Sequence, residues 1–484
     1  MKLRELIQDL EVLECTAGLD TEITGVSYDS RQTQPGDLFV AVKGFEVDGH
    51  RFIPKAMERG AAAVLCEDAP EGAIPYVRIA DCRLGLALVS RTFFGDPAGE
   101  MTVIGYTGTS GKTSSTHILK HVLENRLGAK VGLIGTNGNR IGEELLHSER
   151  TTPESYELHK LFRRMADEGC THVVMEVSSH SLTLERVAGI TFDVAVFTNL
   201  SQDHLDLHGT MEEYAAAKKK IFSQCRIGCV NLDDERTPFM IEGVSCPVFG
   251  FSARSGRGDL YAEDVSLDAS GVSFTMVYRG ERAPTRLNIP GIFSLYNALS
   301  VAAAGLSLGL SLADCAVGLA SAGGVKGRME SVPTDGDYSI LIDYSHKPDA
   351  LEKALKTLRP VTRGRLICLF GCGGDRDRTK RPIMGRIAAE NADLVIVTSD
   401  NPRTEKPEAI IDDILEGMKS TATPVQVICD RVAAIGWAID NVAPGDVILL
   451  AGKGHEDYQE VGHEKRHMDE REIVAEFLKK HTRA

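Results

Sequence analysis

The stretch Val103-Ile104-Gly105-Tyr106-Thr107-Gly108-Thr109-Ser110-Gly111-Lys112-Thr113 runs from apolar residues through glycines into a Lys-Thr pair. The apolar residues are typical of a buried strand, and Ser114 to Asn125 are typical of a helix that follows it. A strand, a glycine-rich loop and a helix start, in this order, place backbone N–H groups and the positive end of a helix dipole against a polyphosphate. We therefore predict a phosphate loop from Gly108 to Thr113. Within it, Lys112 reaches the outer phosphates and the Thr113 hydroxyl binds Mg²⁺.

This loop departs from the usual phosphate-loop pattern at one position. The pattern has a glycine five residues before Gly111, where this chain has Tyr106, and the nearest upstream glycine is Gly108. An ordinary strand-to-helix turn is the alternative reading. The coincidence of Gly111, Lys112 and Thr113 with the right strand and helix context favours the phosphate loop.

Length and composition describe a multidomain globular protein. With 484 residues, the chain is too long for a single ordinary core, and we expect two to four domains. Its 43% hydrophobic and 25% charged residues are typical of a globular protein, and no stretch approaches the length of a membrane span. The first twenty residues mix charged with apolar side chains, which predicts an amphipathic helix rather than a signal peptide. We expect a cytoplasmic protein.

Cysteine spacing and net charge exclude further classes. The eleven cysteines include no Cys-x-x-Cys pair, which favours buried reduced thiols over disulfides or zinc. A net charge of -15 argues against a general nucleic-acid binder, because such proteins need an extended basic surface. It leaves room for an anionic small substrate held by local cations.

The order of strand and helix patterns predicts an α/β protein of three domains. Residues 1–97 read as a small α/β module, in which Pro35-Gly36-Asp37 is a turn into a strand and Ala61 to Cys66 form another strand. Residues 98–332 alternate strands and helices around the phosphate loop, with a β-rich insertion from Asp259 to about Asn288. Residues 333–484 restart the alternation as a doubly wound, Rossmann-like domain. Alternation of this kind produces mainly parallel sheets that bind ligands at the carboxyl ends of their strands.

Polar residues collect at those predicted strand ends in the middle domain. Glu176 ends one strand, and His204 lies in the segment Asp203-His204-Leu205-Asp206-Leu207-His208 that follows another. A carboxylate and an imidazole at such places suit Mg²⁺ or Mn²⁺, although a carboxylate at a strand end is more often capping or salt-bridged. The density of acidic and histidine residues favours metal binding. Thr151-Thr152-Pro153 reads as a helix start with Thr152 as the cap, which predicts a further anion site.

Taken together, motifs along the whole chain resemble the ATP-dependent Mur ligase family of peptidoglycan synthesis. The matching segments include the phosphate loop, Glu176-Val177-Ser178-Ser179-His180, Asp203 to Gly209, Tyr296-Asn297, Gly327-Arg328-Met329-Glu330 and Asp343-Tyr344-Ser345-His346. Tyr28-Asp29-Ser30-Arg31, Asp400-Asn401-Pro402-Arg403 and Gly452-Lys453-Gly454-His455-Glu456 resemble the members of the family that add meso-diaminopimelate to UDP-N-acetylmuramoyl-L-alanyl-D-glutamate. Ser110 stands where asparagine is common and Ser345 where alanine is common.

The resemblance implies a role for each of these motifs. It implies catalytic roles for Lys112, Lys218, Glu176, His204 and His346, with Lys218 carbamylated and His346 a candidate proton acceptor. It implies Mg²⁺ ligands in Thr113, Glu176 and His204. The ATP site that it implies consists of Gly108, Thr109, Ser110, Gly111, Lys112, Thr113, Asn297, Arg328 and Asp343. An ordinary solvated helix lysine is the alternative for Lys218, because Lys219 and Lys220 are adjacent.

The resemblance also implies two further binding sites and the reaction itself. The UDP-linked substrate would contact Ser30, Arg31, Thr151, Thr152, Ser179 and Arg186. Diaminopimelate would contact Arg376, Asp400, Asn401, Pro402, Arg403, Gly452 and Glu456. ATP would activate the glutamate carboxylate as an acyl phosphate, which the amine of diaminopimelate then attacks. Weak contacts with other cell-wall enzymes are a further expectation, and neither nucleic acid nor a membrane span is expected.

Three other functions remain in view. A sister ligase that adds L-lysine and folylpolyglutamate synthetase share the ATP domain, but the motif Asp400 to Arg403 and an N-terminal UDP domain speak against both. A nucleotide-dependent scaffold without chemistry is the third. The presence of a complete set of candidate catalytic residues speaks against it, namely Lys112, Thr113, Glu176, His204 and Lys218.

Overall fold

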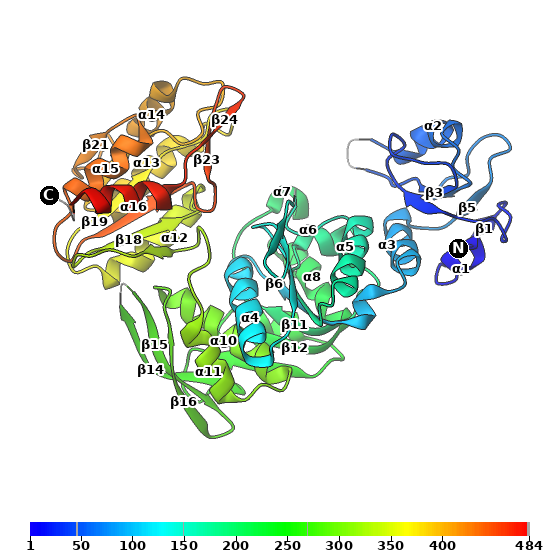
Figure 1. Ribbon diagram of the computed structural model, residues 1–484, viewed down its shortest axis with the longest axis horizontal. Coiled ribbons are helices and arrows are strands. Elements are labelled where there is room, and N and C mark those ends of the chain that lie inside the picture. Colours follow the sequence, from blue (N-terminus) through cyan, green and yellow to red (C-terminus); the bar gives the residue numbers. More distant parts are fainter. Residues whose placement is uncertain (45–46, 149, 269, 482–484) are drawn as a thin grey trace. The chain divides into compact units, whose positions relative to one another are not determined.

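The computed structural model describes residues 1–44, 47–148, 150–268 and 270–481 (Figure 1). The chain forms two compact units, of which the first contains Met1–Tyr261 and Leu299–Gly318 and the second contains Ala262–Ala298 and Leu319–Ala484. Both consist of β-sheets with helices packed on them, which confirms the predicted α/β class. None of the described helices combines the length and apolar composition that a membrane span requires.

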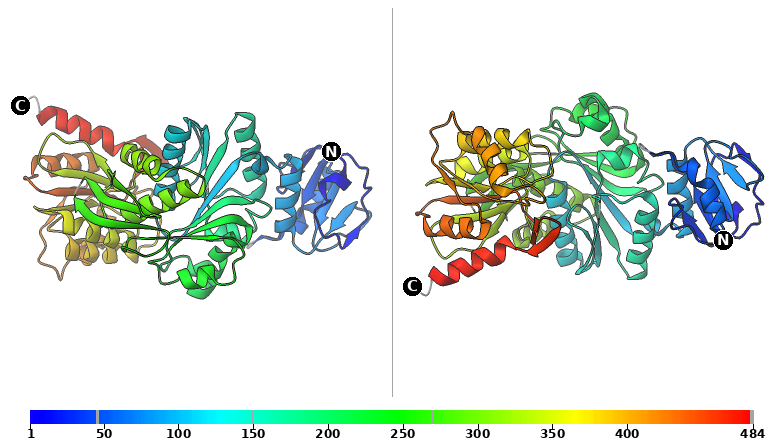
Figure 2. Two further views of the ribbon diagram at one scale, coloured as in Figure 1. Left: turned by 90° about the horizontal axis from the view of Figure 1, so that it is seen from below. Right: turned by 90° about the horizontal axis from the view of Figure 1, so that it is seen from above.

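The N-terminal sheet has the strand order β1-β5-β4-β3-β2 and is drawn in blue in Figures 1 and 2. Strands β2 to β5 are parallel, and β1 is antiparallel to β5. The predicted strand after Pro35-Gly36-Asp37 and the one at Ala61 to Cys66 are β3 and β4. The elements of this module are α1 (Leu3–Leu6), β1 (Glu14–Cys15), β2 (Gly25–Ser27), β3 (Asp37–Val40), η1 (Gly49–Phe52), α2 (Ile53–Glu58), β4 (Ala63–Cys66), β5 (Tyr76–Arg78), α3 (Cys82–Phe93) and η2 (Pro97–Glu100).

The first twenty residues do not form the amphipathic helix that the sequence predicts. Helix α1 ends at Leu6, and β1 follows at Glu14–Cys15. The Leu13 N–H donates to Arg78 O at 2.8 Å and the Thr16 N–H donates to Tyr76 O at 2.9 Å. These hydrogen bonds hold the segment on the edge strand β5, and tertiary pairing of this kind overrides a weak local helix propensity.

The central sheet of the first unit has the order β13-β12-β11-β6-β10-β7-β8-β9. Strands β13 to β7 in this order are parallel, and β8 and β9 are an antiparallel addition that the sequence analysis did not predict. The strands are β6 (Thr102–Thr107), β7 (Val131–Ile134), β8 (Asn139–Ile141), β9 (Glu144–Leu146), β10 (His172–Glu176), β11 (Phe192–Phe197), β12 (Cys225–Asn231) and β13 (Val248–Ser252).

The register of this sheet places the carboxyl ends of strands β6, β10 and β11 side by side at one edge. Glu176 at the end of β10 is paired with Tyr106 of β6, and Phe197 at the end of β11 is paired with Thr107. These three strands are almost wholly buried, as is typical of parallel strands covered on both faces. The covering and connecting helices are α4 (Lys112–Leu127), α5 (Ser155–Asp167), α6 (Ser179–Thr183), α7 (Leu205–His208), α8 (Met211–Lys219), η3 (Lys220–Gln224) and α9 (Thr237–Ile241).

A β-rich segment follows, as the sequence predicts. Strand β14 (Leu260–Asp268) begins beside β13 at the end of the first unit, and β15 (Gly271–Tyr278) pairs antiparallel with β16 (Glu281–Leu287) in the second. The helices α10 (Ile292–Ser307) and α11 (Leu312–Ser321) come next.

The C-terminal sheet has the order β17-β18-β22-β19-β20-β21, parallel except for β17. Helices α15 and α16 pack on the face that carries Ile340, Ile367 and Ile448, and α12, α13 and α14 cover the other face (Figure 1). This is the predicted doubly wound arrangement. Its elements are β17 (Glu330–Val332), β18 (Ser339–Asp343), α12 (Pro348–Leu358), η4 (Arg359–Val361), β19 (Leu366–Phe370), α13 (Lys380–Asn391), β20 (Leu394–Val397), α14 (Pro407–Glu416), β21 (Val425–Val427), α15 (Arg431–Asp440), β22 (Val447–Ala451), β23 (Tyr458–Val461), β24 (Glu464–His467) and α16 (Glu470–His481).

Candidate active site

The phosphate loop has the strand, loop and helix context that its sequence predicts. Gly108 directly follows β6 with φ 146°, and Gly111 is the N-cap of α4 with φ 86°. A Cβ atom on Gly108 would lie 2.0 Å from Thr198 Oγ1, so only glycine fits there. The loop passes this close to the end of β11 because the two strands are neighbours in the sheet.

The segment after β11 holds the loop by side-chain hydrogen bonds. Asn199 Oδ1 accepts the Ser110 N–H at 3.0 Å, Asn199 Nδ2 donates to Ser110 O at 3.0 Å, and the Thr198 hydroxyl donates to the same carbonyl at 2.8 Å. The Thr109 hydroxyl lies 3.1 Å from the phenol oxygen of Tyr214. These contacts fix the loop backbone before any ligand binds.

Lys112 and Thr113 lie at the start of α4 and face different groups. Lys112 Nζ donates to Gly108 O at 2.7 Å and to Thr109 O at 3.1 Å, so its charge lies over the loop. The Thr113 hydroxyl donates to Glu176 Oε2 at 3.0 Å. The structure thus brings together two of the predicted Mg²⁺ ligands.

Glu176 is buried at the end of β10, with 1% of its surface exposed. Its carboxylate accepts the Thr113 hydroxyl, the Thr136 N–H at 2.9 Å and the Thr136 hydroxyl at 3.2 Å. Gly135 makes room for it, because a Cβ there would lie 2.5 Å from Glu176 Oε1. Hydroxyl and carboxylate oxygens form the kind of hard donor set that Mg²⁺ prefers.

His204 belongs to a group of histidine rings beyond β10 and β11. It has φ 53°, its ring centroid lies 4.9 Å from that of His180, and its Nε2 lies 3.5 Å from Asp203 Oδ2. His208 lies 5.9 Å from His180 between ring centroids and 5.2 Å from Tyr214. The metal role of His204 stays a prediction.

Lys218 is not a solvated helix lysine. It is 1% exposed, its Nζ donates to Gly108 O at 2.8 Å, and it lies 4.6 Å from the centroid of the Tyr214 ring. Burial, reinforced by the nearby charge of Lys112, lowers the pKa of the Lys218 ammonium well below its ordinary value. The lowered pKa favours the neutral, nucleophilic form of this amine more than in a solvated lysine.

The four predicted contacts to the UDP-linked substrate in the central domain lie near Glu176. The Thr151 hydroxyl is 3.0 Å from that of Thr136, and Ser179 Oγ is 3.0 Å from His208 Nε2. Arg186 donates to Thr152 O at 3.2 Å and forms an ion pair with Glu154 at 2.7 Å.

Thr152 is not the helix cap that the sequence predicts. Helix α5 begins at Ser155 with Glu154 as its N-cap residue. The Thr152 hydroxyl instead donates to Glu176 O at 2.9 Å and accepts the Ser178 N–H at 3.2 Å, so its capacity to accept is used by the segment after β10. The predicted anion site at this helix start therefore loses its basis, although Thr152 itself lies beside Glu176.

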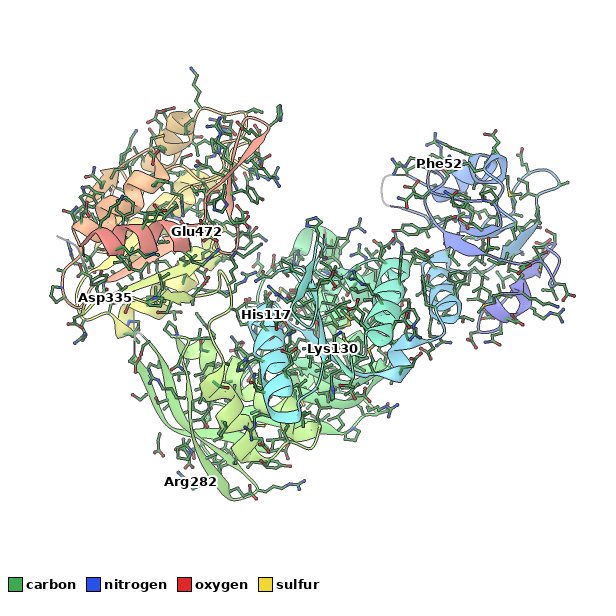
Figure 3. All side chains as sticks on the ribbon, in the orientation of Figure 1. Phe52, His117, Lys130, Arg282, Asp335 and Glu472 are labelled. Atoms are coloured by element: carbon green, nitrogen blue, oxygen red, sulfur yellow. The ribbon has the colours of Figure 1, made fainter. Side chains whose placement is uncertain are left out.

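Ser30 and Arg31 line a pocket of about 540 Å³ in the first unit. Its other lining residues come from the N-terminal module, including Lys55 and Phe52, and from the central domain, including Glu154. Phe52 is labelled in Figure 3 and is 42% exposed. Arg31 forms an ion pair with Asp29 at 2.7 Å, yet its side chain is 78% exposed and is accessible to an anionic ligand.

Two of the predicted ATP residues of the second unit, Arg328 and Asp343, lie close to each other at the carboxyl end of β18. Asp343 ends β18 and accepts the Met329 N–H at 2.8 Å, which ties the segment containing Arg328 to it. The Arg328 guanidinium lies 5.3 Å from the centroid of the Tyr344 ring. Asn297 is half-buried on α10, and its role stays a prediction.

His346 follows β18 and is available as a proton acceptor. Its Nδ1 lies 2.9 Å from Tyr344 O, an acceptor, so the ring proton belongs on Nδ1 and Nε2 carries the lone pair. Burial lowers the pKa of His346, which keeps the ring neutral.

The predicted diaminopimelate residues meet where β20 and β22 end. Asn401 Nδ2 donates to Glu456 Oε2 at 2.9 Å, and a Cβ on Gly452 would lie 2.7 Å from Asp400 Oδ2. Arg403 Nε donates to Glu460 Oε2 at 2.9 Å and Arg403 NH1 donates to Gly374 O at 2.8 Å. The Pro402 carbonyl packs against Gly374. Arg376 is exposed on the adjacent loop and donates to Asp375 O, and its ligand contact stays a prediction.

Sequence reasoning missed several residues of this site. Lys453 stands inside one of the quoted motifs and Asn199 and Tyr214 stand outside them, and the sequence analysis predicts no role for any of the three. Their signal was weak, because each acts on a residue that lies 50 or more positions away. The buried Arg381 of α13 was also missed, and ion pairs at 2.8 Å join it to Glu405, in the loop after β20, and to Asp413 of α14.

The sequence matches three domain families in chain order. Residues 22–85 match the Mur ligase family catalytic domain, residues 106–305 the Mur ligase middle domain, and residues 327–454 the Mur ligase glutamate ligase domain.

Full-length relatives and a solved structure agree with these matches. The chain is 44% identical over 486 residues to a UDP-N-acetylmuramoyl-L-alanyl-D-glutamate--2,6-diaminopimelate ligase of Clostridium acetobutylicum, covering 99% of each chain. It is 45% identical to the ligase of the same name from Chlorobium phaeobacteroides, covering 99% of this chain and 97% of the other. A solved ligase structure of that name is similar at a TM-score of 0.78 and 30% identity, with 100% of this chain and 99% of the other covered.

Proposed function

Because the chain belongs to the Mur ligase family, we propose that it is an ATP-dependent ligase that joins meso-diaminopimelate to UDP-N-acetylmuramoyl-L-alanyl-D-glutamate. The amide forms at the D-glutamate side chain, in the synthesis of the peptidoglycan precursor. The observation that carries the proposal is the phosphate loop, where Lys112, Thr113, Glu176 and Lys218 meet. An ATP-consuming reaction on a UDP-linked precursor suits the cytoplasm.

The chemistry follows from the poor reactivity of a carboxylate. Its oxide is a poor leaving group, so the carboxylate oxygen first attacks the γ-phosphorus of ATP, and ADP leaves with the bridging oxygen. The amine of diaminopimelate then attacks the carbonyl carbon of the acyl phosphate. The C–O bond to phosphate breaks, phosphate leaves, and a base takes the proton from the amine.

The first step joins two anions, which costs Coulomb energy unless cations lie between them. Lys112 supplies one fixed charge at the loop. The oxygens of Thr113 and Glu176 suit Mg²⁺, and we propose that Thr113 holds one ion while Glu176 and His204 hold a second. When bound, Mg²⁺ supplies positive charge that offsets the repulsion between carboxylate and phosphates. The loop and its hydrogen bonds position the reacting groups.

Lys218 supports a further assignment. We propose that its neutral amine adds CO₂ and loses a proton, which gives a carbamate. This change replaces an uncharged amine beside Lys112 with an anion that can orient a metal ion or Lys112. The buried position explains why the amine would be neutral enough to react.

The carbamate makes a prediction of its own. Lys218→Ala should lose activity, and a short carboxylate such as acetate should restore part of it by filling the vacated site. Lys219→Ala, at the adjacent half-buried position, is the matched control and should need no acetate. The absence of any rescue, with an unmodified Lys218 mass in the native protein, would count against the carbamate.

Substrate binding is assigned to separate groups of residues in the two units. The pocket that contains Ser30 and Arg31 receives the uridine diphosphate, and Thr151, Thr152, Ser179 and Arg186 contact the muramoyl peptide. The loops with Asp400 to Arg403, Gly452, Glu456 and Arg376 receive diaminopimelate. His346 takes the proton through its free Nε2 lone pair. Asn297, Arg328 and Asp343 contact the nucleoside of ATP.

One assay separates this function from its rivals. Phosphate release is measured with ATP and Mg²⁺, with and without the UDP-linked dipeptide, and with meso-diaminopimelate, L-lysine or no amino acid. The proposal requires full release only with both the dipeptide and meso-diaminopimelate. Equal use of L-lysine would identify the sister ligase, and no release under any condition would identify a scaffold.

A further inference from the structure

Lys453 is a buried cation to which none of the roles above applies. It follows Gly452 just beyond β22, and its side chain is 0% exposed. Its Nζ donates to Asn401 Oδ1 at 2.9 Å and to Glu456 Oε2 at 3.0 Å, and it lies 3.9 Å from Asp400 Oδ1. A buried ammonium is tolerated only where acceptors surround it, and here the acceptors belong to the residues assigned to the incoming amino acid.

Lys453 fixes the orientation of the Asn401 amide. Asn401 Oδ1 accepts two hydrogen bonds, one from Lys453 Nζ and one from the Glu460 N–H at 2.9 Å. Two donors on one atom identify it as the oxygen. Asn401 Nδ2 is therefore directed at Glu456 Oε2, to which it donates at 2.9 Å.

The same contacts orient the Glu456 carboxylate. Among the described residues, its two hydrogen-bond donors, Lys453 and Asn401, both lie on Oε2. Oε1 is thus the oxygen left for a ligand. The Glu456 side chain is 16% exposed, so this oxygen is in reach of a small molecule that enters the loops.

Lys453 is also connected to the arginine of the site. The backbone of Glu460, which bonds Asn401 through its N–H, accepts the Arg403 N–H at 3.1 Å, and its side chain accepts Arg403 Nε at 2.9 Å. Substitution of Lys453 should therefore disturb the Glu456 carboxylate, which suits an ammonium, and the Arg403 guanidinium, which suits a carboxylate.

We infer that Lys453 is a positioning residue for the far end of the incoming amino acid, where an ammonium and a carboxylate lie together. It holds Glu456 and Asn401 in the arrangement that receives the ammonium, and its charge keeps the Asp400 and Glu456 carboxylates from repelling each other. This inference rests on the proposed function. It adds a residue that sets specificity without touching the substrate.

The test is the kinetics of Lys453→Met, which keeps the length of the side chain and removes its charge. We expect the apparent Michaelis constant for meso-diaminopimelate to rise by roughly tenfold or more, because one partner of a buried charged group has been removed. The constants for ATP and the UDP-linked dipeptide should stay within about twofold, a change of little energetic weight. Lys419→Met, at an exposed lysine paired with Glu416, is the matched control.

A double variant distinguishes positioning from a general structural effect. If Lys453 acts through Glu456, Lys453→Met combined with Glu456→Gln should be no worse than the more severe single variant. Multiplied effects of the two substitutions would overturn the inference. The preference for meso-diaminopimelate over L-lysine should also fall in Lys453→Met, which mere loss of stability would not cause.

Two further outcomes are separable. If Lys453→Met does not fold by circular dichroism, Lys453→Gln, which retains an N–H donor, takes its place and should raise the same constant by a smaller factor. If the unmutated enzyme makes no product from meso-diaminopimelate, the proposed function fails. If it does, and the Lys453 variants keep its constant for that substrate, only the positioning role is wrong.

Discussion

Gly108 of the phosphate loop has both a structural and a chemical role. Gly108 brings the backbone against Thr198 at a place where a Cβ would lie 2.0 Å from the hydroxyl, and its carbonyl then accepts both Lys112 and Lys218. The Lys112 ammonium places positive charge at this carbonyl, where phosphates bind, and the neutral Lys218 amine donates to the same oxygen. The loop therefore holds the Lys112 charge in place before ATP arrives.

Lys112 should be needed for turnover and dispensable for folding. We expect Lys112→Ala to reduce phosphate release by at least about 100-fold, the order seen when one group that stabilises developing charge is removed. Its thermal unfolding midpoint should stay close to that of the unmutated protein. Lys130→Ala, labelled in Figure 3 and paired with Glu168 at 3.6 Å, is the control that should keep its activity. A near-normal rate in Lys112→Ala would refute the phosphate-loop assignment.

Arg403 should select the second carboxylate of the amino acid. Its side chain is 20% exposed and offers a planar fork, and losing one side of such a pair costs roughly 2 to 5 kcal/mol. Arg403→Ala should therefore raise the apparent meso-diaminopimelate constant well over tenfold and leave the ATP constant nearly unchanged. Arg378→Ala, at a more exposed arginine paired with Asp413, is the control. Intact use of meso-diaminopimelate by Arg403→Ala would remove this role.

Residues that belong to a local sequence motif could be predicted. Residues that act through partners far away in the sequence could not. Gly111, Lys112 and Thr113 follow a local pattern that sequence displays. Lys453 and Asn199 act through contacts to Asn401 and Ser110, which the fold brings near from 52 and 89 positions away. No local pattern carries that information.

At the scale of elements, the parallel strands were the most predictable part. Strands β6 and β10 are largely apolar because helices cover both faces, and they lie where the sequence predicts them. The short edge elements were not predictable. Strand β1 forms because its backbone pairs with the edge strand β5. Strands β8 and β9 extend the central sheet by antiparallel pairing.

The burial of His159 on α5 should make the free energy of unfolding depend on pH. His159 on α5 is fully buried, and burial, with Arg91 of α3 nearby, lowers its pKa to about 3. The unfolded chain takes up this proton below about pH 6.5 while the folded chain does not, so acid favours unfolding. The free energy of unfolding should fall by up to about 1.4 kcal/mol per pH unit as pH drops from 6.5 towards 3.

Urea unfolding of His159→Leu between pH 7.5 and 5 tests this expectation. The variant should lose the part of the pH slope that His159 contributes. His147→Leu, at an exposed position, should keep the slope of the unmutated protein. An identical slope in all three proteins would show that His159 does not titrate as its burial requires.

At the scale of the molecule, each unit carries residues to which the proposed function assigns a role. The first unit holds the phosphate loop and the pocket with Ser30 and Arg31, and the second holds the loops with Asn401, Arg403 and Lys453. The relatives match this chain over 99% of its length, so the similarity to ligases includes the second unit and not only the ATP domain. The proposed reaction therefore assigns roles to residues of both units.

The most direct test follows the oxygen atoms of the glutamate carboxylate. The UDP-linked dipeptide is labelled with oxygen-18 in both oxygens of that group and incubated with ATP, Mg²⁺ and meso-diaminopimelate, and the products are weighed by mass spectrometry. Activation as an acyl phosphate requires the tripeptide to keep one label and the released phosphate to carry the other. Unlabelled phosphate, or phosphate released without tripeptide, would contradict the account.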